Sequence, residues 1–285
     1  MNHIHPYQNE LSDILRKQRI TPLFQPIVHL ASERAIGYES LSRGPQQSPL
    51  HTAGSLFEAA EQCQRLPELE KICVHKAAAA WSSFGIDSQL FINLSPDMLL
   101  HSQQHQWELP QLMQRHRLSA NQVVFEISER TPALQLDELK NSVQHLQAQG
   151  FSIAIDDMGS GYSGLKLWSE LQPDFVKKID RYFIHNIDSN PIKLKFVRSL
   201  VQLAEQLDCQ LIAEGVETRS ELLAIADLGI ELVQGYLFGR PQLTPQRIYH
   251  SQSFSSATVL NIESARTETP LQYLMFQDTP RMSAL

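Results

Sequence analysis

The chain has 285 residues, 42% of them hydrophobic and 19% charged, which is enough for a substantial core in one large barrel domain or two small domains. Its formal net charge of −7 argues against a protein that holds large nucleic acids through a broad basic surface. Neither a membrane-spanning apolar run nor a signal-peptide layout is present, so we expect a cytoplasmic protein without a membrane segment. Three cysteines, odd in number and without metal-ligand spacing, predict neither a disulfide framework nor a zinc site.

Taken in chain order, a lead-in helix within 1–19 precedes a repeated theme of a short apolar run followed by a longer amphipathic stretch. Helical patterns with plausible glycine stops at Gly85, Gly150 and Gly229 separate the runs. The helical patterns cover 54–64, 67–84, 133–148, 191–207 and 219–228, and the apolar runs lie at 23–28, 35–38, 90–92, 123–125, 153–155, 175–176, 211–213 and 232–233. This alternation predicts an α/β fold with a mainly parallel sheet, closed as a TIM-like (β/α)8 barrel over 20–245, with an open doubly wound sheet as the alternative.

Beyond Pro241 the periodicity weakens, and residues 246–285 are rich in Ser, Thr and Gln. We interpret this segment as a linker or tail, consistent with truncation from a longer signalling protein.

A polar residue follows almost every apolar run. In a parallel barrel these positions converge on one rim, where barrels place their active sites. The residues are Glu39, Asn93, Glu126, the pair Asp156-Asp157, a Lys-Lys-Ile-Asp segment at 177–180, Glu214 and Gln234.

Several carboxylates and a carboxamide at one rim would repel one another unless cations lay between them. Oxygen ligands without Cys or His favour Mg²⁺ or Mn²⁺ over Zn²⁺. The adjacent Asp156-Asp157 pair fits two ions per site, an arrangement that supports metal-assisted phosphoester hydrolysis. Each residue taken alone also has a simpler interpretation as a helix cap or a turn residue, but independent caps have no reason to fall at the same end of nearly every strand.

Six sequence blocks resemble those of one known family, over about residues 20–245. Tyr38-Glu39-Ser40-Leu41-Ser42-Arg43-Gly44-Pro45 is similar to the Glu-Ala-Leu signature of the EAL phosphodiesterases, with Ser40 in place of the usual Ala. The other blocks are Phe24-Gln25-Pro26-Ile27-Val28, Asn93-Leu94-Ser95, Phe125-Glu126-Ile127-Ser128-Glu129, 156–163, 213–218 and 234–241. The resemblance implies an EAL-type barrel, which can include one antiparallel strand, and hydrolysis of cyclic di-GMP to linear pGpG by in-line attack of a metal-bound water.

The resemblance also implies roles for individual residues. Glu39, Asn93, Glu126 and Asp156 would ligate the first ion, and Asp156, Asp157 and Glu214 the second, with Glu214 also counted as catalytic. Glu129, also counted as catalytic, would support the loop that begins at Asp157. Contacts to the substrate would come from Gln25, Arg43, Asp180 and Gln234.

The sixth strand departs from the family pattern, because Asp174-Phe175-Val176-Lys177-Lys178-Ile179-Asp180 contains one extra residue. Lys178 keeps the Lys-Ile-Asp spacing and is our candidate for the catalytic lysine, with Lys177 as the alternate. Since a one-residue shift reverses the faces of a strand, we expect a β-bulge near 176–178 that leaves Lys178 pointing into the barrel.

The leading hypothesis is therefore a cyclic di-GMP phosphodiesterase that uses Mg²⁺ or Mn²⁺. The alternatives are a catalytically weak or inactive cyclic di-GMP receptor and an interaction module. The resemblance further implies a homodimer, and the full-length protein is expected to carry further signalling domains.

Overall fold

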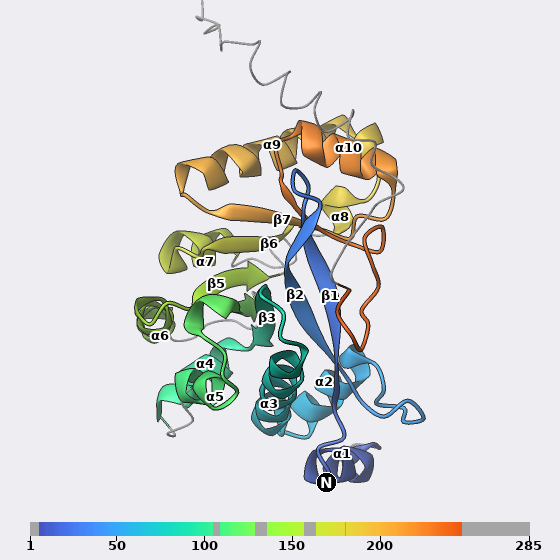
Figure 1. The fold of residues 1–285 in the computed structure, drawn as a ribbon, viewed down its shortest axis with the longest axis vertical. Coiled ribbons are helices and arrows are strands. Elements are labelled where there is room, and N and C mark those ends of the chain that lie inside the picture. Colours follow the sequence, from blue (N-terminus) through green and yellow to red (C-terminus); the bar gives the residue numbers. More distant parts are fainter. Residues whose placement is uncertain (1–5, 105–108, 129–135, 157–163, 180, 247–285) are drawn as a thin grey trace, which may run out of the picture. The chain divides into compact units, whose positions relative to one another are not determined.

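The computed structural model describes residues 6–104, 109–128, 136–156, 164–179 and 181–246, without the side chains of residues 101–104, 178 and 179. These residues belong to one unit, Met1–Ser251. Eight strands form a closed barrel in chain order (Figure 1), so the predicted closed barrel is confirmed and the open sheet is excluded. The strands are β1 (Thr21–His29), β2 (Arg34–Arg43), β3 (Gln89–Leu94), β4 (Val123–Ser128), β5 (Ser152–Asp156), β6 (Phe175–Ile179), β7 (Gln210–Glu214) and β8 (Leu232–Gln234).

One strand runs against the others, as the family resemblance implied. β1 pairs antiparallel with β2 on one side and with β8 on the other, while each pair from β2–β3 to β7–β8 is parallel. The carboxyl ends of β2 to β8 therefore lie at the same end of the barrel, which is the end where a (β/α)8 barrel carries its site.

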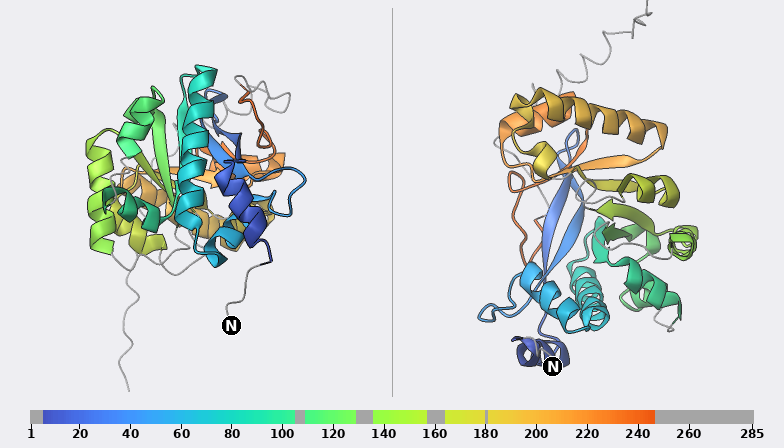
Figure 2. Two further views of the ribbon diagram at one scale, coloured as in Figure 1. Left: turned by 90° about the horizontal axis from the view of Figure 1, so that it is seen from below. Right: turned by 180° about the vertical axis from the view of Figure 1, so that it is seen from behind.

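Helices cover the outside of the barrel (Figure 2). The predicted glycine stop after residue 84 is confirmed, since Gly85 has φ 58° at the end of the third helix and this left-handed conformation suits glycine. The helices are α1 (Gln8–Arg16), α2 (Ala53–Gln62), α3 (Leu66–Phe84), α4 (Pro96–Gln104), α5 (Leu109–Arg115), α6 (Leu136–Ala148), α7 (Gly164–Leu171), α8 (Arg181–Ile184), α9 (Pro191–Gln206) and α10 (Arg219–Asp227), with short 3₁₀ turns at Ala120–Gln122 and Ile187–Ser189.

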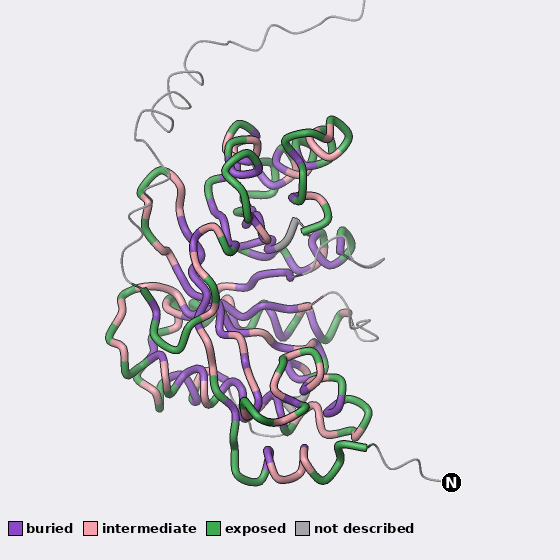
Figure 3. The backbone as a smooth tube through the Cα atoms, turned by 90° about the vertical axis from the view of Figure 1, so that its right-hand side faces the viewer, coloured by how far each residue is buried: buried purple, intermediate pink, exposed green. Residues whose placement is uncertain are grey.

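The interior of the barrel is filled by one apolar side chain from nearly every strand. The strands are largely buried and the outer faces of the helices exposed (Figure 3), as expected for a sheet enclosed by helices. The residues of this cluster are Ile27, Phe91, Val124, Ala154, Phe175, Ile212 and Leu232. They form the layer on which the polar residues at the mouth rest.

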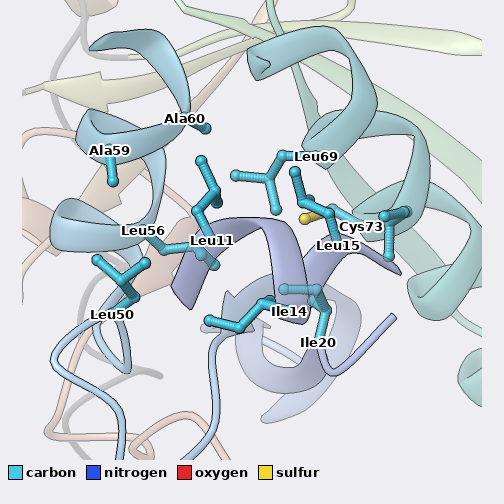
Figure 4. Packing of buried hydrophobic residues seen from close by; sticks show 11 residues of the cluster. Leu11, Ile14, Leu15, Ile20, Leu50, Leu56, Ala59, Ala60, Leu69 and Cys73 are labelled. Carbon is cyan, nitrogen blue, oxygen red and sulfur yellow. The ribbon is translucent and has the colours of Figure 1, made fainter. Parts of the chain in front are cut away.

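A second apolar cluster connects α1 to α2 and α3 outside the barrel (Figure 4). Leu11, Ile14 and Leu15 of α1 are buried against Leu56 of α2 and Leu69 of α3. Helix α1, which lies within the segment 1–19, thus contributes to the core. At the other end of the described chain, Gln242 exchanges two backbone hydrogen bonds with Phe24 of β1, at 2.7 and 3.0 Å.

The proposed tail, residues 246–285, lies outside the described residues except for Gln246. Among the helices that the structure describes, none combines the length and the apolar character needed to cross a membrane.

Candidate active site

The strand periodicity explains how the polar residues reach the mouth of the barrel. Residues two positions apart on a strand face the same side, so each residue two positions beyond the apolar layer also points inward. From β3 to β8 these apolar and polar residues are Phe91 and Asn93, Val124 and Glu126, Ala154 and Asp156, Phe175 and Lys177, Ile212 and Glu214, and Leu232 and Gln234. The sequence therefore builds an apolar layer and a polar layer directly above it.

Lys177 lies at the centre of the polar layer. Its side chain is 0% exposed, and its Nζ lies 2.7 Å from Glu39 Oε2, 2.8 Å from Glu126 Oε2 and 3.1 Å from Glu214 Oε1. Three predicted metal ligands from β2, β4 and β7 thus meet around one ammonium group. A buried carboxylate needs such a partner, because an unpaired charge in the interior is strongly unfavourable.

Three amide side chains extend this cluster toward β1 and β3. Asn93 Nδ2 donates to Glu39 Oε1 at 2.9 Å, and Gln234 Nε2 donates to Glu39 Oε2 at 2.8 Å. Gln234 also reaches Gln25 Oε1 at 3.3 Å, and Gln25 Nε2 donates to the carbonyl of Gly239 at 3.2 Å. Both oxygens of Glu39 are therefore held in place, Oε1 by a side chain of β3 and Oε2 by side chains of β6 and β8.

The electrostatics of the cluster are set by burial and by mutual attraction. Burial raises the pKa of Glu126 well above its ordinary value, and the carboxylates of Glu39 and Asp156 add to this against the opposing effect of Lys177. For Lys177, burial acts to lower the pKa, but the surrounding carboxylates outweigh it and hold the pKa well above its ordinary value. Lys177 is therefore a permanent cation at neutral pH.

The carboxylates outnumber this one ammonium, which leaves the mouth of the barrel with an excess of oxygen donors. Glu126 Oε1 is buried without a hydrogen-bond partner among the described residues, although Oε2 of the same carboxylate is paired with Lys177. An oxygen in this state fits a hard divalent cation. Within the described ranges, however, no group of three or more Asp, Glu, His or Cys side chains is arranged so that it could hold a metal ion.

The extra residue of β6 is absorbed as predicted, by an irregularity in the pairing with β7. Lys177 pairs with Ile212 and Ile179 with Ala213, so two steps along β6 correspond to one step along β7. The bulge follows Lys177, and Lys177 keeps the inward direction set by Phe175. The lysine found among the carboxylates is thus Lys177, our alternate, while the side chain of Lys178 lies outside the described residues and its role stays a prediction.

A cavity of about 510 Å³ opens beside the carboxylates. Glu39, Asn93 and Asp156 line it at the barrel mouth, and residues of α2 and α3 line its far side. This volume is in the range of small-molecule sites. Arg43 lies at the end of β2, where Nη1 donates to the carbonyl of Ser42 at 2.9 Å; its predicted contact with substrate remains a prediction.

Three further predicted site residues, Glu129, Asp157 and Asp180, lie outside the described residues. Glu70, by contrast, lines the cavity although the sequence motifs did not predict it as a site residue. It lies on α3 and is only 5% exposed. A sequence pattern that could have identified Glu70 is its position on the same helical face as three residues that line the cavity, Leu66, Cys73 and Ala77.

A (β/α)8 barrel with an acidic, oxygen-rich mouth beside a small-molecule cavity defines the class of this protein. Residues 8–241 match the EAL domain, and the chain belongs to this family.

Relatives of known name and structure agree with this assignment. The chain is 36% identical over 151 residues to the cyclic di-GMP phosphodiesterase PdeF of Escherichia coli. The aligned segment covers 53% of this chain but only 20% of PdeF. A standalone EAL protein from Vibrio cholerae, solved with cyclic di-GMP, superposes with a TM-score of 0.74 at 30% identity and covers 83% of this chain and 98% of its own. Klebsiella pneumoniae BlrP1, solved with manganese and cyclic di-GMP, superposes with a TM-score of 0.73 at 31% identity. The match covers 81% of this chain and 58% of the BlrP1 chain.

Proposed function

We propose that this chain hydrolyses cyclic di-GMP to linear pGpG with the help of two divalent cations, Mg²⁺ or Mn²⁺. The observation that carries the proposal is the meeting of Glu39, Glu126 and Glu214 around Lys177 at the mouth of an EAL barrel. The names of PdeF and of the two solved complexes support the substrate and the need for a divalent cation.

In this proposal the cations would be held by oxygen ligands from different strands, namely Glu39, Asn93, Glu126, Asp156 and Glu214, together with Asp157. When bound, they would activate a water and neutralise the charge that develops on the phosphate. The unpaired Oε1 of Glu126 and the all-oxygen donor set are the features that fit them.

Lys177 would have two tasks. It keeps three carboxylates at hydrogen-bonding distance despite their mutual repulsion. Its permanent charge would also attract the phosphodiester at the point where negative charge increases during the reaction. The cavity bounded by α2 and α3 would hold the remainder of the dinucleotide.

The test is to incubate the protein with cyclic di-GMP and Mn²⁺ or Mg²⁺ and to separate the nucleotides by chromatography. We expect pGpG to accumulate with the wild type and not with Asp156→Asn, whose circular dichroism spectrum should match the wild type. Binding of cyclic di-GMP without turnover in either metal would replace the enzyme with a receptor. The homodimer, the cytoplasmic location, the domain boundaries and any further signalling domains stay predictions.

A further inference from the structure

Glu70 is a buried carboxylate to which the proposed reaction assigns no task. It lies on α3, is 5% exposed, and lines the cavity that contains Glu39, Asn93 and Asp156. Burial raises its pKa to about 7, against the opposing effect of two hydrogen bonds from Ser95. A carboxyl group in such surroundings needs hydrogen-bond partners that offset part of the cost of burial.

Those hydrogen bonds both come from the turn between β3 and α4. The backbone N–H of Ser95 donates to Glu70 Oε1 at 2.9 Å, and Ser95 Oγ donates to Oε2 at 2.8 Å. Ser95 Oγ in turn accepts the N–H of Met98 at 3.1 Å, which caps the first turn of α4. One side chain of α3 thus fixes both the end of β3 and the start of α4.

The turn that Glu70 holds begins directly beyond Asn93. Ser95 is two residues from Asn93, and the carboxamide of Asn93 donates to Glu39 Oε1 at 2.9 Å. A carboxamide that is to offer its oxygen to a cation must keep this orientation, with its N–H₂ group on Glu39. Side chains that orient ligands from outside the coordination sphere commonly determine how tightly a metal is bound.

We propose that Glu70 is a positioning residue that, through Ser95, fixes the β3–α4 turn and thereby presents the Asn93 carboxamide to a divalent cation. The inference rests on the proposed function, because it takes the barrel mouth to be a cation site. It adds a residue of α3 to a site otherwise built from strand ends.

The test compares Glu70→Ala with Glu70→Gln and with the matched control Asp174→Ala. Asp174 Oδ2 also accepts a backbone N–H, that of Ile153 at 2.8 Å, but at the amino-terminal end of β6, away from the mouth. Mn²⁺ affinity is measured by titration calorimetry without nucleotide, and thermal unfolding is measured in EDTA. We expect Glu70→Ala to bind Mn²⁺ about 10-fold to 100-fold more weakly. Glu70→Gln, which can still accept the Ser95 N–H, should stay within about 3-fold of the wild type, and Asp174→Ala should bind as the wild type does even if it is less stable.

Equal Mn²⁺ affinity of Glu70→Ala and the wild type would overturn the inference and leave the proposed function standing. A loss in Asp174→Ala as large as that in Glu70→Ala would also overturn it, since both losses would then reflect general destabilisation. A wild type that binds no Mn²⁺ would overturn the cation part of the proposed function and this inference together. A wild type that binds Mn²⁺ but fails to hydrolyse cyclic di-GMP would overturn only the proposed function.

Discussion

The ammonium of Lys177 lies 2.8 Å from Oε2 of Glu126, and both side chains are 0% exposed. Loss of Lys177 would leave Glu126 buried without its cationic partner, and breaking a buried ion pair in this way is strongly destabilising. The pair joins β4 to β6 across the barrel mouth, so the stability of the fold and the layout of the site depend on the same contact.

Replacing Lys177 should therefore damage both stability and activity. Lys177→Ala leaves three buried carboxylates without their cation, and we expect a loss of about 3 kcal/mol or more in the free energy of unfolding by urea. We expect at least about a 100-fold fall in kcat for cyclic di-GMP hydrolysis. The matched variant Lys178→Ala should keep most of its activity; an inactive Lys178→Ala beside an active Lys177→Ala would return the catalytic role to Lys178.

The difference between these two lysines indicates what the sequence could predict. The eight strands, the closed barrel and the polar residue after each apolar run were all predictable, because strand alternation and chain order determine them. The position of the bulge within β6, which brings Lys177 to the carboxylates, was not predictable from the sequence. The Lys-Ile-Asp motif aligns the strand from its carboxyl-terminal side, beyond the bulge. The inward face of β6 is instead set by Phe175, which lies before the bulge.

Glu70 was not predicted as a site residue, because its burial also depends on the three-dimensional structure. A single Glu in a helix is usually exposed, and only packing of α3 against the β3–α4 turn makes this one buried. Its pKa of about 7, against 4.5 when exposed, means that the folded state holds the proton more tightly than the unfolded state. The favourable contribution is thus fully present below about pH 4.5 and is lost as the pH rises to about 7.

Glu70→Gln should remove this pH dependence. The difference in unfolding free energy between the variant and the wild type should change by up to about 3 kcal/mol between pH 4.5 and pH 8, with the variant relatively more stable at the higher pH. Urea unfolding at several pH values provides the measurement. Parallel stability curves for the two proteins would mean that Glu70 has an ordinary pKa.

Gly235 follows Gln234 at a point where the backbone of the next loop approaches closely. A Cβ at this position would lie 2.1 Å from the carbonyl oxygen of Val216, so one of the two backbones must move. We expect Gly235→Ala to lose at least about 2 kcal/mol of stability and to displace Gln234 from Glu39. Gly54→Ala is the control, because no atom lies within 4 Å of its added Cβ. Similar unfolding temperatures for both variants would contradict this packing.

Helix α1 should be an integral part of the domain. Leu11 is 0% exposed against α2 and α3, so Leu11→Ala should cost about 2–5 kcal/mol in unfolding free energy. Leu207→Ala, at a position 48% exposed, should change it by no more than about 0.5 kcal/mol. A Leu11→Ala protein as stable as the wild type would show that α1 contributes little to the core.

The central claim is that the carboxylates at the barrel mouth bind divalent cations. Anomalous diffraction from crystals grown with Mn²⁺ and cyclic di-GMP tests it most directly, because the signal locates the metal itself. We predict manganese peaks among Glu39, Asn93, Glu126 and Asp156, with Lys177 still beside the carboxylates. A nucleotide bound at the mouth without any manganese peak there, or manganese bound only elsewhere on the protein, would contradict the claim.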